Sequence, residues 1–254
     1  MYINKKIVVL MLLVALLLPG TTAQAADCYV MNYEYNTPQN IGGAKFITKK
    51  YEKNGTYIYK ILMKKNGRTQ VLLKDVENGY LTNGKIIYYV KHTEKSSDWK
   101  WENTIYRYNI RTKKKERVIS GINYTVRASN GRYLYYGQDN EADGVELHVL
   151  DMKTGKKRHI MDAVSNVHIA GNRVVISLLS GVPENLPIYS FTLKGTDKKT
   201  IAVGNLLKTK GTTVYYYRIN VKANLRRMYS CNALGGNKKA LTGWIKRIPE
   251  KYWH

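Results

Sequence analysis

The chain carries five copies of a motif about 40 residues long. Each copy opens with a glycine-containing turn and continues with an apolar or tyrosine-rich strand, a loop and a second strand. A lysine-rich turn and a short third strand complete it. The opening glycines are Gly43, Gly84, Gly131, Gly171 and Gly211, so the steps are 41, 47, 40 and 40 residues. Repeats of this period, each with several strands, are typical of a β-propeller.

Two hydrophobic patterns recur inside each copy. The first strand is almost continuously apolar or aromatic, as at 86–90 and 174–179, which indicates a strand covered on both faces. The second strand alternates, so that Tyr106, Tyr108 and Ile110 share one face. These patterns predict blades that pack face to face.

The predicted fold is therefore an all-β propeller of five four-stranded blades in a single domain, residues 26–254. The expected repeats span residues 28–75, 76–120, 121–162, 163–203 and 204–243. Residues 244–254 begin like another strand and are expected to close the ring, with residues 28–35 as the other closing segment. The alternative is a sixth, degenerate blade made from both termini.

The N-terminus predicts a secretory signal peptide over residues 1–25. Lys5 and Lys6 precede twelve apolar residues at 7–18, and small residues at Ala23 and Ala25 suit a cleavage site. A spanning helix needs about 20 apolar residues, so we expect no transmembrane span after cleavage. An uncleaved anchor is the lesser alternative. The protein is thus expected to be secreted or associated with the cell envelope.

Two cysteines remain after cleavage, Cys28 and Cys231. Export permits a disulfide between them, which would join the mature N-terminus to the last repeat. Against this, Cys231 aligns with apolar positions of the other repeats, such as Leu150 and Phe191. This register favours a small buried hydrophobic residue over a disulfide partner.

The charge is strongly positive and follows the repeats. The net charge is +24, and without Lys5 and Lys6 the chain has 40 basic and 18 acidic residues, or +22. Such a chain attracts polyanions in a salt-dependent manner. We call the lysine-rich turns, expected at the outer edge of one face, the basic rim. Its candidate binding residues are Lys113, Lys114, Lys115, Lys156, Lys157, Arg158, Lys198, Lys199, Lys238 and Lys239. The other explanation is that lysine protects exposed outer strands.

A second candidate binding feature is the insertion that lengthens the second repeat. Trp99 and Trp101 alternate there with charged residues, and we expect them on a loop of the opposite face. Exposed tryptophans stack on sugars or anchor protein interfaces. The alternative is that they pack against a neighbouring blade.

Metal and catalytic patterns are weak. Asp139, Glu141 and Asp143 resemble the first half of a calcium loop, but the position twelve residues on from Asp139 is Leu150 rather than glutamate. A hairpin turn explains them more simply. The sequence has no nucleophile elbow, zinc-protease helix motif or phosphate loop. We expect no cofactor.

The residues of the repeat resemble those of a known group of proteins. Ile105-Tyr106-Arg107-Tyr108-Asn109 followed by Lys114-Lys115 recurs in later repeats. It is similar to the low-density-lipoprotein-receptor-type and TolB-type propeller repeats, and especially to a family of secreted Gram-positive propellers of unknown function. The resemblance covers residues 40–243 and implies a propeller that binds proteins or has no assigned role. The receptor-type Tyr-Trp-Thr-Asp motif is absent.

The function expected from the sequence is non-enzymatic binding outside the cell. The partner is an anionic cell-wall or surface polymer, or an extracellular protein, with no specific nucleic-acid recognition. The alternative is a secreted hydrolase or lyase that acts on glycans, with carboxylates converging at the propeller axis.

Overall fold

The computed structural model describes residues 30–32, 39–53, 56–77, 79–95, 101–140, 144–179 and 185–249, and the structural statements below concern these residues. They form strands β1 to β20 and no helix. The all-β prediction is confirmed.

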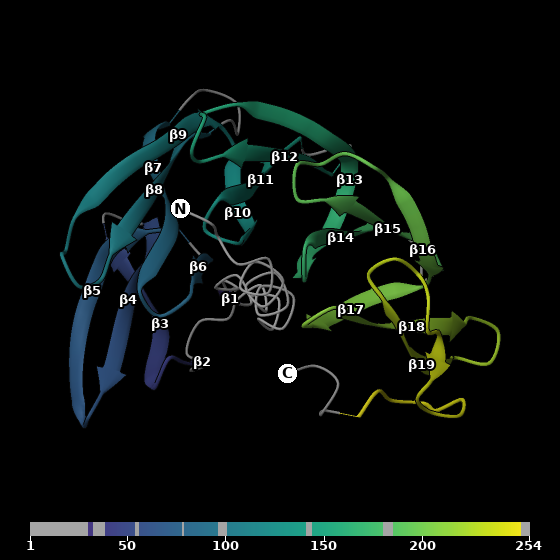
Figure 1. The fold of residues 1–254 in the computed structure, drawn as a ribbon. Coiled ribbons are helices and arrows are strands. Elements are labelled where there is room, and N and C mark those ends of the chain that lie inside the picture. The colour runs from purple at the N-terminus through teal and green to yellow at the C-terminus, as the bar shows by residue number, and fades with distance from the viewer. Residues whose placement is uncertain are drawn as a thin grey trace, which may run out of the picture.

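The strands form four-stranded antiparallel blades arranged in an arc around a common centre (Figure 1). Blade 1 consists of β2 (Gln39–Ile41), β3 (Ala44–Lys53), β4 (Thr56–Lys65) and β5 (Arg68–Val76). Blade 2 consists of β6 (Tyr80–Thr82), β7 (Ile86–Lys95), β8 (Trp101–Asn109) and β9 (Lys115–Ile122). Blade 3 begins with β10 (Tyr124–Ser129), β11 (Tyr133–Asp139) and β12 (Val145–Asp151). Blade 4 contains β14 (Arg173–Leu178), β15 (Pro187–Thr192) and β16 (Lys199–Val203). Blade 5 consists of β17 (Asn205–Lys210), β18 (Thr213–Asn220), β19 (Leu225–Asn232) and β20 (Lys239–Ala240).

The strand β13 (Lys157–Ala170) belongs to two blades. Its first half pairs with β12 as the outer strand of blade 3, and its second half pairs with β14 as the inner strand of blade 4. The pairing register shifts between Val164 and Asn166, and Ala163 has a positive φ of 53°. The chain therefore passes from one blade to the next by a bend within a continuous strand.

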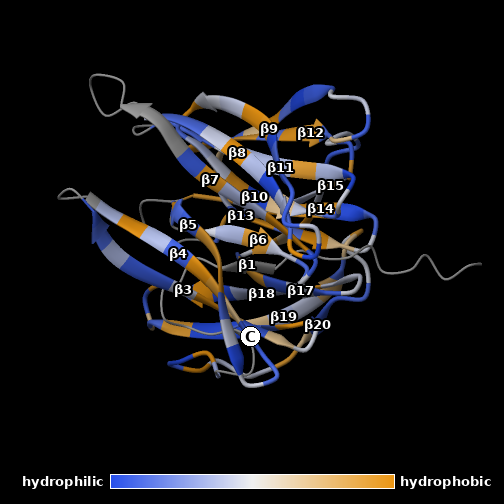
Figure 2. Cartoon of the chain, turned by 90° about the vertical axis from the view of Figure 1, so that its left-hand side faces the viewer, coloured by the Kyte–Doolittle hydropathy of each residue, from blue (hydrophilic) through white to orange (hydrophobic). Residues whose placement is uncertain are grey.

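Hydrophobic cores lie between consecutive blades. Phe46, Ile61 and Ile87 are fully buried between blades 1 and 2, and Val214 is buried between blades 4 and 5. In Figure 2 the hydrophobic residues are concentrated in the strands, while the connecting turns are mostly hydrophilic. Burial on both faces explains the continuously apolar strands of the repeat.

Aromatic pairs repeat from blade to blade. Tyr89 stacks on Tyr106 with ring centroids 5.6 Å apart, and Tyr216 stacks on Tyr229 at 5.4 Å. In blade 3 a histidine takes the place of the second tyrosine, since His148 stacks on Tyr136 at 5.3 Å. These cross-strand pairs add to the packing of each blade.

The lysine-rich turns begin with a polar cap. The Asn109 side-chain oxygen accepts hydrogen bonds from the backbone N–H groups of Arg111 and Thr112, both at 3.0 Å. Asp151 and Asn232 act in the same way at the corresponding turns. The next residue of each turn is apolar and packs against the core shared with the preceding blade; these residues are Ile110, Met152, Leu193 and Ala233. Each turn is thereby anchored to two blades.

Both ends of the described chain differ from the predicted ring closure. Strand β1 (Val30–Asn32) pairs with β6, so it joins blade 2 at its inner edge rather than blade 1. Ile245 forms an antiparallel bridge with Arg226 of β19. The chain thus continues past β20 beside the same strand, β19. The described part of the expected closing segment, 244–249, therefore extends the outer edge of blade 5. Residues 250–254 lie outside the described part.

Candidate functional site

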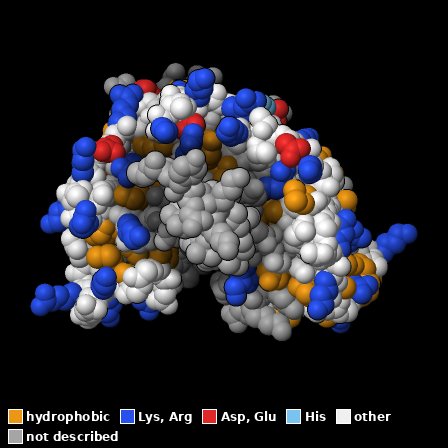
Figure 3. Space-filling model, viewed as in Figure 1, with side chains coloured by type: hydrophobic (Ala, Val, Ile, Leu, Met, Phe, Trp, Pro, Cys, Tyr) orange, Lys and Arg blue, Asp and Glu red, His pale blue; other side chains and the backbone are white. Residues whose placement is uncertain are grey.

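The basic rim is built by the turns between the third and fourth strands of the blades. In blades 2 and 3 the third strand ends at the polar cap, and a seven-residue step to the fourth strand brings a basic residue back beside it. Lys115 pairs with Tyr108, and Lys157 pairs with Leu150. In blades 4 and 5 the step is nine residues, because Lys199 pairs with Ser190 and Lys239 pairs with Ser230. All ten predicted rim residues are exposed. Figure 3 shows Lys and Arg side chains distributed around the outer edge of the molecule, with few Asp or Glu among them.

Few of the rim charges are neutralised by residues that the structure describes. Lys114 lies 3.0 Å from a Glu116 oxygen, and Lys199 lies 3.8 Å from Asp197. Lys198 is placed over the ring of Tyr189, 4.0 Å from its centroid. The remaining rim residues form no ion pair within the described part of the chain; they are Lys113, Lys115, Lys156, Lys157, Arg158, Lys238 and Lys239. The rim therefore has a local excess of positive charge.

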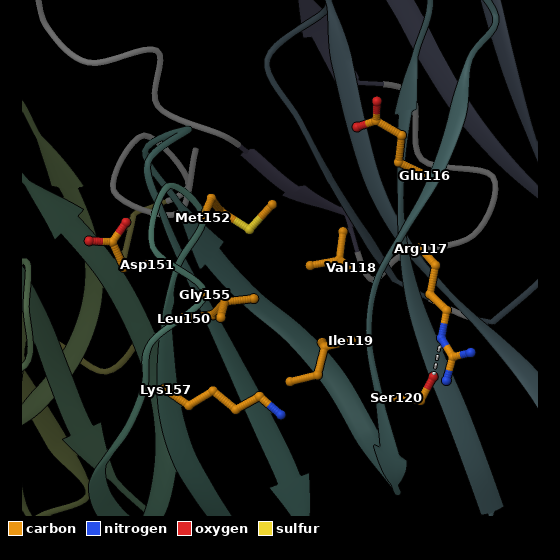
Figure 4. Close-up of a pocket in the computed structure, with 10 residues that line it drawn as sticks. All are labelled: Glu116, Arg117, Val118, Ile119, Ser120, Leu150, Asp151, Met152, Gly155 and Lys157. Atoms are coloured by element: carbon orange, nitrogen blue, oxygen red, sulfur yellow. Dashed lines mark hydrogen bonds between the residues drawn. The ribbon is translucent and has the colours of Figure 1, made fainter.

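A pocket of about 460 Å³ opens in the rim between blades 2 and 3. Its residues come from β9, from the end of β12, from the start of β13 and from the turn between those two strands. Its lining consists of Glu116, Arg117, Val118, Ile119, Ser120, Leu150, Asp151, Met152, Gly155 and Lys157. Figure 4 shows Val118, Ile119, Leu150 and Met152 between β9 and the blade 3 turn, with Lys157 extending toward Ile119. The Arg117 and Ser120 side chains lie on the other side of β9. The volume is within the usual range for small-ligand pockets.

The two carboxylates of this pocket are held as anions by neighbouring cations. Glu116 accepts a hydrogen bond from Arg107 at 2.9 Å, and hydrogen bonds from Lys114 and Arg107 lower its pKa. Asp151 accepts one from Arg132 at 3.1 Å, and although burial acts to raise its pKa, the Arg132 and backbone hydrogen bonds leave it lowered. Neither carboxylate is in the protonated state that a general acid requires at neutral pH.

The predicted tryptophan site is only partly within the described residues. Trp101 is not on a loop, because it is the first residue of β8 and pairs with Lys95. Its side chain is half-buried, and its backbone N–H donates to the Asn123 side chain at 2.8 Å. The insertion thus lengthens the hairpin of β7 and β8, since each added pair of residues can form further backbone hydrogen bonds between the two strands. Trp99 falls in the part that is not described.

The calcium and disulfide candidates are likewise only half described. Asp139 ends β11, and the following Asn140 N–H donates to the Gly144 carbonyl, which agrees with a hairpin. Glu141 and Asp143 are outside the described residues. The described residues contain no cluster of three or more His, Cys, Asp or Glu side chains able to hold a metal ion. Cys231 is a buried free thiol whose pKa is raised by burial, and Cys28 is not described, so the disulfide remains a prediction.

The inner strands are relevant to the predicted alternative of a glycan-acting enzyme, because that alternative requires carboxylates at the propeller axis. The described inner strands, β1, β2, β6, β10, β17 and the second half of β13, contain no Asp or Glu. Sequence reasoning did not anticipate the pocket between blades 2 and 3, whose residues come from two repeats. The only sequence signal for this pocket is that charged and apolar residues stand close together around the turns.

Comparison of the structure with known structures identifies propellers. The chain resembles the β-propeller domain of the Trilobed protease from Pyrococcus furiosus, with a TM-score of 0.61 and 11% identity over 84% of this chain and 72% of that one. It resembles TolB from Acinetobacter baumannii with a TM-score of 0.50 and 12% identity, covering 86% of this chain and 56% of that one. The Pyrococcus horikoshii acylaminoacyl peptidase gives 0.59 and 14%, covering 86% of this chain.

At these identities the likeness shows the fold alone, and the chain spans 40% of the length of that peptidase. The propeller and TolB-like parts of the sequence resemblance agree with these structures. No protein-family model and no curated protein matches the sequence, so the expected likeness to the lipoprotein-receptor type has no sequence-level support. In the described part of the chain, no helix has the length and hydrophobicity needed to cross a membrane.

Proposed function

We propose that the protein is an exported, non-enzymatic binding module that attaches to an anionic polymer of the cell envelope through its basic rim. The observation that carries this proposal is the recurrence of exposed lysines at one structural position in successive blades. Cations that recur at the same turn of successive blades match a chain molecule with repeated negative charges better than scattered lysines do. Export is the part of the proposal that rests on the N-terminal sequence.

Two features support the choice of a binding module. Most of the rim lysines form no ion pair with other described residues, so no such pair has to break when a polymer binds. The described inner strands offer no carboxylates at the axis for acid–base chemistry on a glycan. The protein-partner alternative rests on Trp99 and Trp101 and on no further described contact.

The proposal is tested by comparing two triple variants. The first removes rim charges through Lys115→Gln, Lys156→Gln and Lys238→Gln. The second removes the same charge elsewhere through Lys49→Gln, Lys222→Gln and Lys246→Gln, all exposed positions outside the rim. Sedimentation with isolated anionic wall polymer at low salt measures binding. We expect a loss of about tenfold for the rim variant and less than about twofold for the control.

Equal losses in the two triple variants would show that only net charge matters, and the rim would then have no special role. Retention of full binding by both would remove the electrostatic proposal. Release of soluble sugar from the same polymer during the assay would instead support the enzyme alternative.

A further inference from the structure

Blade 1 has one face that packs against no other blade in the described part of the chain. Blades 1 and 5 are the two ends of the arc (Figure 1). The hydrophobic cores join blade 1 to 2, 2 to 3, 3 to 4 and 4 to 5, and none of them joins blade 5 to blade 1. On β3, Ala44 and Phe46 are buried in the core shared with blade 2. Residues 45, 47, 49, 51 and 53 therefore lie on the opposite face, which we call the free face of blade 1.

The free face carries alternating rows of lysines and apolar residues. Strands β3 and β4 pair directly, so each row consists of one residue from each strand. The successive rows are Lys45 with Lys64, Ile47 with Leu62, Lys49 with Lys60, and Tyr51 with Ile58. Because a strand rises about 3.4 Å per residue, the rows follow one another at intervals of about 7 Å.

The two lysine rows are not neutralised by described residues. Three of the four lysines are exposed and Lys60 is half-buried, 5.4 Å from the centroid of the Tyr51 ring. None of the four forms an ion pair within the described part of the chain, whereas Lys53, further along β3, is paired with Asp75 at 3.2 Å. Like charges directly opposite each other on antiparallel strands are destabilising. The folded blade thus holds two unfavourable pairs that an acidic partner would relieve.

The apolar rows offer surface for a partner to bury. Ile47, Tyr51 and Ile58 are half-buried, while Leu62 is 6% exposed. The row of Leu62 continues onto β5, where its neighbour Val71 is 44% exposed. Covering these side chains would add hydrophobic stabilisation to the attraction of opposite charges.

The order of the rows indicates the kind of partner. Side chains on one face of any β-strand recur with the same two-residue period, so a sheet with alternating acidic and apolar residues matches the free face row by row. Each of the described cores is likewise formed by one blade packed face to face on another. A second copy of this chain does not supply such a face. Strands β17, β18, β19 and β20 of blade 5 contain no Asp or Glu, and Lys208 and Arg226 lie on the face that points away from blade 4.

We propose that the free face of blade 1 is a docking surface for a protein partner, a β-sheet whose exposed face alternates acidic and apolar residues. The acidic side chains contact the four lysines, and the apolar side chains lie on Ile47, Ile58 and Val71. This inference goes beyond the proposed function, because it uses none of the ten rim residues and requires no envelope polymer.

The direct test measures binding of a β-hairpin peptide to residues 26–254. The probe is a disulfide-closed hairpin with Glu and Val alternating on one face and Thr on the other. The control hairpin has the same composition, with its Glu residues moved to the Thr face. In a fluorescence anisotropy titration we expect saturable binding of the probe and at least about tenfold weaker binding of the control. Equal affinities, or binding of neither peptide, would overturn the proposal.

A matched pair of double variants separates the free face from general attraction. Lys49→Glu with Lys60→Glu reverses one lysine row and should weaken binding of the probe at least about tenfold. Lys222→Glu with Lys246→Glu makes the same change of charge at exposed positions elsewhere and should weaken it by less than about twofold. Equal losses in the two double variants would refute the free face as the site.

The single variant Lys49→Glu tests the lysine row without any ligand. It places opposite charges across from each other at positions 49 and 60, so the midpoint of thermal unfolding should rise by about 1–3 °C. Lys222→Glu should give no such rise. A fall in the midpoint for Lys49→Glu would contradict the unfavourable lysine pair on which the proposal depends.

The rim variant described above separates this inference from the proposed function. Lys115→Gln with Lys156→Gln and Lys238→Gln should change binding of the hairpin probe by less than about twofold. The variant with Lys49→Glu and Lys60→Glu should attach to wall polymer as well as its matched control does. Loss of hairpin binding in the rim variant alone would refute the free face. Loss of polymer attachment only in the variant of the lysine row would refute the rim.

Discussion

At the scale of single residues, Arg173 fixes the lysine-rich turn of blade 4. It is 6% exposed, and its guanidinium donates to the Ser190 hydroxyl, the Ser190 carbonyl, and both the carboxylate and the carbonyl of Asp197, at 2.6–3.1 Å. Ser190 in turn donates to the Ala233 carbonyl of blade 5 at 2.6 Å. The arginine thus connects the turn to the strand that holds the next blade.

Replacing Arg173 by Met should reduce the free energy of unfolding by about 2–4 kcal/mol, because buried acceptors lose their donor. Asp197→Asn should cost clearly less, since the Asp197 side chain is 49% exposed and its backbone carbonyl remains bonded. Urea denaturation of both variants measures the two values. Similar losses for the two substitutions would contradict the role given to the buried acceptors.

His168, in the second half of β13, makes stability depend on pH. Burial lowers its pKa to about 4, whereas an unfolded histidine titrates near 6.5. The folded state therefore favours the neutral ring, and this stabilisation is complete above about pH 6.5 and is lost as the pH falls toward 4. The lowered pKa values of Asp75, Glu116, Asp151 and Asp197 act in the same direction at lower pH.

His168→Gln should therefore flatten the dependence of stability on pH. Between pH 7 and about pH 4.5, the wild type should lose on the order of 2 kcal/mol more unfolding free energy than the variant. Chemical denaturation at a series of pH values measures this difference. Parallel pH profiles for the two proteins would show that this histidine does not carry the effect.

At the scale of the element, glycine determines how closely a lysine-rich turn approaches the preceding blade. Gly195 and Gly155 both have positive φ, at 75° and 71°, so alanine is strained at each by about 1 kcal/mol. Only at Gly195 would the new methyl group also meet Ile160. Gly195→Ala should therefore be more destabilising than Gly155→Ala by about 1–2 kcal/mol in thermal or urea unfolding. Equal effects would contradict the close packing of the blade 4 turn.

The elements also show what sequence could and could not predict. Strand pairs such as β7 and β8 follow from their hydrophobic patterns, because burial on both faces or on one face dictates which residues are apolar. The basic rim follows from the same repeat. The position of Trp101 could not be predicted from the sequence, because the same inserted residues can either extend a hairpin or lengthen a loop. The pocket depends on how closely the turn of blade 3 approaches β9 of blade 2. This is a contact between repeats, which no local sequence pattern encodes.

At the scale of the whole molecule, the proposed attachment to a polyanion depends on exposed charges that recur in several blades. Attraction of this kind is screened within about 10 Å at 0.1 M salt, whereas contacts through tryptophan side chains are much less sensitive to salt. The salt dependence of binding therefore distinguishes attachment through the rim from attachment through Trp99 and Trp101.

The most direct test is the affinity of residues 26–254 for isolated anionic wall polymer across a salt series, with an uncharged glycan as the control ligand. The rim predicts binding to the anionic polymer that falls at least about tenfold between 50 mM and 200 mM salt, and no binding to the control. Binding that is absent at low salt, or that does not change as salt rises, would contradict the rim as the site of attachment.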